Sequence, residues 1–203
     1  MRYRGANLRG VGGWVGRLLR LDLSAFDEIR ADPSATLGAV MVVLGASVMA
    51  GIGSWLWAAQ TDGVTASEVF FKSLIAGSIL QTLAWFIWVY MVFQVLARAY
   101  GARTDFYELI RTMGFAFAPV ALSVFVAIAG FTVPFGVLSL AVAVLLTHFA
   151  IQASSSAEPQ QALVANITGF AVFAVVMGVL ANIAETDTVG GLAPGLFFFD
   201  LDF

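Results

Sequence analysis

The stretch Arg111-Thr112-Met113-Gly114-Phe115-Ala116-Phe117-Ala118-Pro119 lies at mid-chain, where a polar and charged loop passes into apolar sequence. Two long apolar runs come before it, and two short runs and a third long run follow it. A helix that begins at an arginine, carries an early glycine and then a proline is suited to close helix approach and to a bend. We therefore expect Arg111 to mark the inner end of the third of five membrane-spanning helices.

The composition indicates that lipid covers most of the surface. Hydrophobic residues make up 60% of the 203 residues and charged residues only 11%, with a mean hydropathy of +0.91. Soluble domains carry roughly 25% charged residues. The sequence contains no cysteine, which excludes disulfides and thiol nucleophiles. We predict an all-α integral membrane protein, a five-transmembrane-helix bundle preceded by an N-terminal amphipathic interfacial helix.

The predicted domain organisation has three parts. A basic amphipathic N-region, 1–34, precedes a membrane domain, 35–184, and an acidic tail, 185–203, follows it. The predicted spans are about 35–57, 69–97, 112–129, 134–152 and 162–184. Four of them are close to the length of about 20 residues that crosses a bilayer as a helix, and the second, 69–97, is longer than needed. The short Gly130–Pro134 link makes the third and fourth spans an antiparallel hairpin.

The N-region has the pattern of a helix at the membrane interface. At helical spacing Trp14, Leu18 and Leu21 share one face, with Leu19 beside it, and Arg17 and Arg20 lie opposite. Such a helix is suited to anionic lipid, although a helix that packs on a protein partner has the same pattern. Six arginines without a continuous apolar core do not fit a cleavable signal peptide.

Two start signals separate this helix from the first span. The tetrapeptide Ser24–Asp27 fits a capping box, so a helix is expected to restart there. Asp32 followed by Pro33 is typical of an N-cap with proline at the first helical position. In the first span, Ser47 and Gly51 are four residues apart and form a small-residue face for close helix packing.

The charges predict the orientation. Every lysine and arginine except Lys72 falls in the N-region or in the loop between the second and third spans. The positive-inside rule therefore places the N-terminus in the cytoplasm and the C-terminus outside. We expect a multi-pass protein of the cytoplasmic (inner) membrane.

The search for chemistry gives few candidates. No Asp, Glu or Arg lies within the predicted spans, which disfavours ion-coupled transporters. The only histidine, His148, has two interpretations: an axial ligand to a haem or chlorin, or a side chain hydrogen-bonded near the headgroups. Trp85 and Trp88 either form an aromatic surface for a pigment, a quinone or a partner helix, or pack as ordinary aromatics. No cofactor is required, although a bound pigment, quinone or lipid is compatible with the sequence.

The hexapeptide Gly114–Pro119 resembles the Gly-Tyr-x-x-x-Pro signature of the Yip family, the Ypt/Rab-interacting multispan membrane proteins. The approach to the first span, Phe26–Pro33, is similar to that of prokaryotic members, and the resemblance covers roughly residues 20–184. It implies a cytoplasmic N-region, five spans, a tight hairpin of the third and fourth spans and an outside C-terminus. The residues at the motif positions are Asp32, Pro33, Gly114, Phe115 and Pro119.

The departures from the family pattern favour its prokaryotic branch. Phe115 replaces the usual tyrosine, and the Asp-Leu-Tyr-Gly-Pro motif of eukaryotic members is reduced to Asp32-Pro33. Rab binding is therefore not carried over.

We expect a non-enzymatic protein that acts as a structural or accessory subunit, or as an organiser, in the membrane. The alternative is a free-standing membrane-shaping or trafficking-type protein, and a transporter or channel component comes third. The expected partners are the lipid bilayer and other membrane protein subunits, and no nucleic acid.

Overall fold

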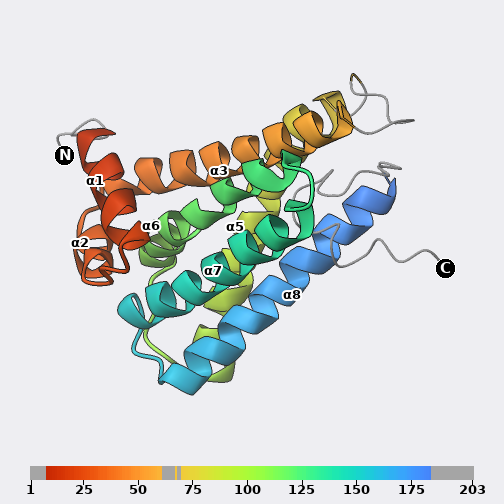
Figure 1. Ribbon diagram of the computed structural model, residues 1–203. Helices are drawn as coiled ribbons and strands as arrows, with labels where there is room; N and C mark the ends of the chain where they lie inside the picture. The colour runs from red at the N-terminus through yellow and green to blue at the C-terminus, as the bar shows by residue number, and fades with distance from the viewer. Residues whose placement is uncertain (1–7, 61–66, 68–69, 184–203) are drawn as a thin grey trace. The chain divides into compact units, whose positions relative to one another are not determined.

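The computed structural model describes residues 8–60, 67 and 70–183, and its named elements are all helices (Figure 1). In chain order the elements are α1 (Leu8–Leu19), α2 (Ala25–Ala31), α3 (Ala35–Ala58), the π-helix η1 (Phe70–Gly77), α5 (Ser78–Gln94), the π-helix η2 (Val95–Ala99), α6 (Phe106–Ala116), the 3₁₀-helix η3 (Ala118–Ala127), α7 (Thr132–Ala153) and α8 (Pro159–Ile183). Within the described residues there is no β-strand. An isolated bridge pairs Thr104 with Ser155.

Five helices are long and apolar enough to cross a membrane, which confirms the predicted fold class of a multi-pass helical protein. They cover Ala35–Ala58, Phe70–Ala99, Phe106–Ala127, Thr132–Ala153 and Pro159–Ile183. The third is 72% buried over its most apolar window, against 39–44% for the other four. The third span is therefore the one that protein covers most, and the other four offer more of their surface to lipid.

The third span begins at Phe106, earlier than the predicted residue 112, because Asp105 caps the helix. Its Oδ1 accepts hydrogen bonds from the backbone N–H groups of Tyr107 at 2.9 Å and Glu108 at 3.0 Å. The charged residues that suggested a loop are thus the first turns of α6. The expectation that no Glu or Arg lies within a span was wrong, since Glu108 and Arg111 belong to this helix.

Pro119 changes the type of helix rather than only bending it. The α-helix ends at Ala116, and the ten residues of η3 continue the span as 3₁₀-helix. Proline has no N–H to donate to the carbonyl four residues earlier, and it disfavours α-helical geometry at the residue before it. Ten residues advance about 20 Å at the 3₁₀ rise of about 2.0 Å per residue, against about 15 Å in an α-helix.

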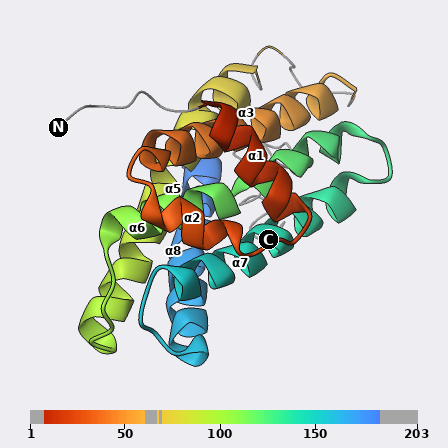
Figure 2. The ribbon, with the colours of Figure 1, turned by 90° about the vertical axis from the view of Figure 1, so that its left-hand side faces the viewer.

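The chain divides into two compact units, and each long span contributes one part to each of them. Unit 1 comprises Met1–Val43, Phe86–Ala118 and Ala143–Phe170, and unit 2 comprises Leu44–Trp85, Pro119–Val142 and Ala171–Phe203. All the described arginines from Arg17 onward belong to unit 1, whereas Lys72 is the one described lysine or arginine of unit 2. In unit 1, α1 and α2 lie against α6 and the first turns of α3 (Figures 1 and 2).

Small residues bring the helices of unit 2 close together. A Cβ atom added to Gly51 would lie 2.8 Å from the Cα of Leu74 and 3.0 Å from the carbonyl oxygen of Ser73. Ser78 donates a hydrogen bond to the carbonyl oxygen of Ser47 at 3.2 Å. The first and second spans therefore touch along the face that carries Ser47 and Gly51.

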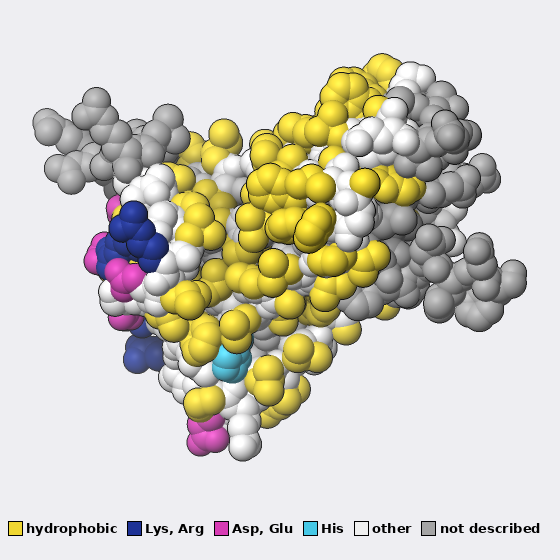
Figure 3. Space-filling view, in the orientation of Figure 1, with side chains coloured by type: hydrophobic (Ala, Val, Ile, Leu, Met, Phe, Trp, Pro, Cys, Tyr) yellow, Lys and Arg dark blue, Asp and Glu magenta, His cyan; other side chains and the backbone are white. Residues whose placement is uncertain are grey.

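Large apolar side chains stay exposed along the outer spans. Examples that are each more than half exposed are Leu37 on α3, Leu83 on α5, Leu145 on α7 and Val175 on α8. A space-filling view shows such side chains over much of the surface, with charged side chains gathered over α1 and α2 (Figure 3). Lipid contact explains this surface, since water would disfavour it.

Candidate functional site

The most elaborate polar cluster of unit 1 joins α1 to α2, and we call α1, α2 and the turn between them the collar. At its centre, Arg17 donates from Nε to Asp22 Oδ2 at 2.7 Å and from Nη1 to Glu28 Oε1 at 2.7 Å. Its Nη2 donates to Ser24 Oγ at 3.0 Å, and Trp14 Nε1 donates to Glu28 Oε2 at 3.3 Å. All three nitrogens of one guanidinium thus donate hydrogen bonds, and together they fix the angle between two short helices.

This cluster shifts the titration of its members. The Ser24 hydroxyl and then the Arg17 guanidinium lower the pKa of Asp22 below its ordinary value. Arg17 and then the Trp14 indole lower the pKa of Glu28. Hydrogen bonds from Glu28 and Asp22 raise the pKa of Arg17. All three groups are therefore charged at neutral pH, and the cluster is held by charge-assisted hydrogen bonds.

Ser24 does not cap α2 as predicted. The helix does begin at Ala25, but Ser24 makes no side-chain capping bond, and its Oγ donates to Asp22 Oδ1 at 2.6 Å instead. The Ser24 hydroxyl bonds to the Asp22 carboxylate on the preceding turn, and not to the backbone of α2, because a charged acceptor forms the stronger hydrogen bond.

Apolar contacts dock the collar on the membrane helices of unit 1. The Trp14 ring meets the Phe115 ring of α6 edge to face, with centroids 5.5 Å apart and planes at 86°. A Cβ added to Gly38 of α3 would lie 2.7 Å from Val11 Cγ2, and Leu18 is only 1% exposed. Phe26 and Ile29 of α2 are also buried.

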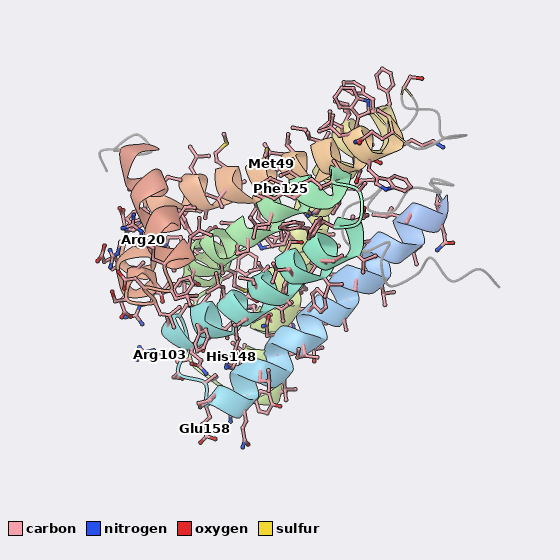
Figure 4. All side chains as sticks on the ribbon, in the orientation of Figure 1. Arg20, Met49, Arg103, Phe125, His148 and Glu158 are labelled. Carbon is pink, nitrogen blue, oxygen red and sulfur yellow. The ribbon has the colours of Figure 1, made fainter. Side chains whose placement is uncertain are left out.

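These contacts correct part of the predicted lipid interface. Leu18 lies inside the protein, Trp14 packs on Phe115, and Arg17 is paired with two carboxylates. Leu18 is therefore not available to lipid, whereas the Arg17 side chain is 34% exposed and Trp14 is half-buried. Of the predicted interface residues only Arg20 is exposed, and Figure 4 shows it at the outer side of the collar. Contact of the collar with lipid stays a prediction.

The outward edge of the collar is a pair of leucines that helical spacing predicted on or beside the apolar face. Leu19 is 57% exposed and Leu21 is 68% exposed, on either side of Arg20. Leu21 has a φ of 62°, a left-handed conformation in which glycine or asparagine is usual. Its N–H bonds to the carbonyl of Leu18 at 2.9 Å, and the N–H of Asp22 bonds to the carbonyl of Arg17 at 3.0 Å.

Those two bonds are the Schellman pattern that ends a helix, with leucine in the position that glycine normally holds. We define Leu19, Arg20 and Leu21 as the collar tip. A sequence search for this feature has no signal to use, because the usual glycine is missing.

The turn between α2 and α3 places the first two family-motif positions. Asp32 Oδ1 accepts from the backbone N–H of Ser34 at 2.9 Å and from its hydroxyl at 2.7 Å, and α3 begins at Ala35. Asp32 and Pro33 therefore form the entry to the first span, as a short side-chain turn rather than a cap on the first helical residues.

Of the other motif positions, Gly114 and Phe115 lie inside the packing of unit 1, and Pro119 belongs to unit 2. A Cβ added to Gly114 would lie 2.7 Å from the Cβ of Ala39 on α3. Phe115 and Pro119 are buried. The glycine thus permits a close crossing of α3 and α6, and the phenylalanine supplies the surface on which Trp14 rests.

Polar contacts also tie the start of α6 to the end of α7 within unit 1. Arg30 Nη1 donates to the carbonyl oxygen of Ala153 at 2.8 Å. Arg103 N donates to Ser156 Oγ at 2.8 Å, and Ser156 N donates to the Arg103 carbonyl at 2.9 Å. Thr112 Oγ1 donates to Ser154 Oγ at 3.1 Å. The collar, α6 and α7 are therefore joined by polar contacts as well as apolar ones.

The predicted aromatic surface is interior. Trp85 and Trp88 are both fully buried, so neither presents a face to a bilayer-borne pigment or quinone. In unit 1, Trp88 packs on Phe170 with centroids 5.3 Å apart and donates from Nε1 to Asn166 Oδ1 at 3.2 Å. The interpretation as packed aromatics describes these residues.

Asn166 is the hub of a buried polar network in unit 1. Its Nδ2 donates to the carbonyl of Val144 at 2.8 Å, and its Oδ1 accepts from Thr147 Oγ1 at 3.2 Å as well as from Trp88. The second, fourth and fifth spans thus meet at one amide whose two polar atoms are both satisfied, which favours a single arrangement of these helices.

His148 lies on α7 and is labelled in Figure 4. Its Nε2 is 2.9 Å from the side-chain nitrogen of Gln152, and its Nδ1 is buried without a hydrogen-bond partner. One ring nitrogen is thus engaged by Gln152 and the other has no partner among the described residues, so ligation of a cofactor by His148 stays a prediction. The part of the chain that the structure describes contains no group of three or more His, Cys, Asp or Glu that suits a metal ion.

The collar and its tip are therefore the best candidate for a functional site, because they combine a fixed polar clamp with an exposed apolar edge. No protein-family model, curated protein or solved structure matches the chain.

Proposed function

We propose that this chain is a non-enzymatic, Yip-like integral membrane protein that organises the bilayer at its arginine-bearing side, with the collar tip as the element that enters the lipid surface. The observation that carries the proposal is Leu21, a large apolar side chain held 68% exposed in a left-handed turn. The left-handed conformation costs about 1–2 kcal/mol for a residue with a Cβ. Exposure to water adds the lost hydrophobic gain.

A residue that is unfavourable twice over in an isolated protein is explained by a contact outside that protein. Leu19 beside it doubles the apolar edge, and Arg20 between the two supplies a positive charge. Two leucines flanking an arginine suit the boundary between acyl chains and anionic headgroups. The clamp at Arg17 keeps this tip at a fixed angle, so that insertion does not require the collar to fold anew.

The charge distribution supports a cytoplasmic location for the collar. The described arginines all belong to unit 1, and cytoplasmic loops of membrane proteins carry an excess of positive charge. The resemblance to the prokaryotic branch of the Yip family supports the same topology and an inner-membrane location. An accessory role within a larger membrane complex is compatible with this proposal, and the collar tip would then meet lipid beside the partner subunits.

The test uses full-length protein in vesicles that contain phosphatidylglycerol. The sequence has no cysteine, so a single cysteine introduced at Leu19 carries an environment-sensitive fluorophore at a unique position. We expect lipids with a spin label near the headgroup to quench this fluorophore more strongly than one placed at Asp27, an exposed residue of α2. Equal and weak quenching at both positions would refute insertion of the tip.

A second readout addresses organisation of the bilayer. We expect wild-type protein to change the diameter distribution of the vesicles in electron micrographs, and L19N/L21N to lose this effect. Asparagine tolerates the left-handed conformation, so the variant removes the apolar edge without removing the turn. Native electrophoresis after gentle extraction then separates the two roles, because an accessory subunit would migrate with a much larger complex.

A further inference from the structure

Arg111 is a buried cation that makes no ion pair with any carboxylate of the described residues. It is 8% exposed, the most buried arginine among the described residues. Its Nε is inaccessible and has no hydrogen-bond partner. The ion pairs found among the described residues are both made by Arg17, so no described carboxylate lies within 4.0 Å of Arg111.

The nearest acid along the helix does not solve this problem. Glu108 lies three residues earlier on α6, close enough for a helical ion pair, yet no pair forms. An arginine stays protonated under all ordinary conditions, so it cannot lose its charge to suit a buried position. A buried guanidinium without a partner is strongly unfavourable, and such groups are retained when an anion completes them.

The depth of Arg111 indicates the kind of anion. It lies five residues after Phe106, where the span begins, which is about 7.5 Å along the helix axis. The polar layer on each side of a bilayer is about 5–8 Å thick. Arg111 therefore lies close to the level where lipid phosphates meet the acyl chains.

The neighbourhood of Arg111 is formed by the collar and the first turns of α3. Residues three and four positions apart share a helix face, which places Arg111 beside Gly114 and Phe115. Gly114 lies against Ala39 of α3, and Phe115 lies against Trp14 of α1. Two of the three collar carboxylates, those of Asp22 and Glu28, are already engaged by Arg17, and the third, that of Asp27, is exposed.

We propose that Arg111 binds the phosphate group of an anionic phospholipid where the collar meets α6. A guanidinium presents paired N–H donors that match two oxygens of a phosphate, and this fit is better than that of a lysine ammonium. The inference deepens the function proposed above, because it names the lipid group that the collar would hold beside the inserted tip. It does not depend on Leu19 or Leu21, so the two proposals fail separately.

The experiment compares full-length variants in mild detergent by native mass spectrometry and thermal unfolding, with phosphatidylglycerol or phosphatidylcholine added. R111Q removes the charge, and R111K keeps it without the paired donors. R98Q is the matched control, because Arg98 is exposed and lies in the same unit. E108Q tests the internal pair, since it removes the one acidic group within a helical turn.

We expect wild type, R98Q and E108Q to retain phosphatidylglycerol and to unfold at a higher temperature in its presence than in phosphatidylcholine. R111Q is expected to bind it about tenfold or more weakly, as loss of a charge-assisted hydrogen bond predicts, with R111K in between. Equal retention by R111Q and wild type would overturn the proposal, as would equal losses in R111Q and R98Q. If R111Q does not fold, the wild-type protein alone tests the proposal. Equal binding of phosphatidylglycerol and phosphatidylcholine by the wild type would also overturn the proposal.

The source of the phosphate is tested by competition. Inorganic phosphate in large excess should leave the bound phosphatidylglycerol in place if Arg111 serves a lipid. Displacement by inorganic phosphate would overturn the lipid assignment and show a site for a soluble phosphate. L19N/L21N should retain phosphatidylglycerol at Arg111, which separates this site from the collar tip.

Discussion

Arg17 of α1 donates to Glu28 of α2 over 2.7 Å, and this bond closes a clamp that also holds Asp22, Ser24 and Trp14. Both carboxylates of the clamp have a pKa below the ordinary value. A group with a lowered folded-state pKa adds stability above its unfolded pKa and loses it as the pH falls through the folded pKa. The clamp is therefore complete at neutral pH and fails in acid.

We predict that collar opening becomes easier below about pH 4, the ordinary range of carboxyl pKa values, and changes little between pH 5 and 7. Hydrogen exchange of the collar amides, corrected for the intrinsic pH dependence, measures this. E28Q should open more easily than wild type at neutral pH and respond less to acid. The same opening free energy at pH 3 and pH 7 in wild type would show that the clamp does not hold the collar.

The collar shows where sequence reasoning succeeds and where it stops. Helical spacing predicted one apolar face with Trp14, Leu18 and Leu21. Leu18 is buried and Trp14 packs on Phe115, but Leu21 is 68% exposed. Helical spacing does not say whether that face meets lipid or protein. The partner surface, Phe115 and the gap beside Gly38, comes from distant parts of the chain. The five spans were predictable because a run of about 20 apolar residues has few other stable environments.

Other features had no local signal. Leu21 takes a left-handed conformation that the presence of leucine does not announce. Arg111 was assigned to a boundary because charged residues usually mark one, and only the cap at Asp105 shows that the helix had already begun. Both are positions where local preference is overridden, and both lie in the proposed lipid-binding region.

Gly114 should be intolerant of even one methyl group. An added Cβ would lie 2.7 Å from the Ala39 Cβ and close to the Ala39 backbone, so α3 and α6 would have to separate. We predict that G114A lowers the free energy of unfolding by about 1–3 kcal/mol, as overpacking does. Thermal unfolding in detergent measures the change.

Gly45 provides the matched control for Gly114. It lies in α3, and an added Cβ at Gly45 would meet no atom within 4 Å. G45A should therefore be neutral or stabilising by up to about 1 kcal/mol, because alanine is the better helix former. Equal losses in G45A and G114A would mean that the effect arises from glycine chemistry in general and not from the crossing with Ala39.

Asn166 should contribute stability through the partners that it satisfies. N166A removes the acceptor of Trp88 and Thr147 and the donor to Val144. Since a buried group that loses its partner costs about 1–3 kcal/mol, we predict a loss of at least that size. N182A is the control, because Asn182 is exposed and its amide donates within its own helix to Gly178. A loss in N182A as large as that in N166A would contradict the network's role.

Gln81 is predicted to behave in the opposite way, so that its removal stabilises the protein. It is 1% exposed in α5, and neither its Nε2 nor its Oε1 has a hydrogen-bond partner among the described residues. Methionine has a similar unbranched shape and no group that requires a partner. Q81M should therefore raise the free energy of unfolding by about 1–3 kcal/mol.

The same change at the exposed Gln160 should have almost no effect. If Q81M instead lowers the unfolding temperature, a polar partner holds this amide in the membrane, and Gln81 becomes a binding residue rather than an unfavourable one.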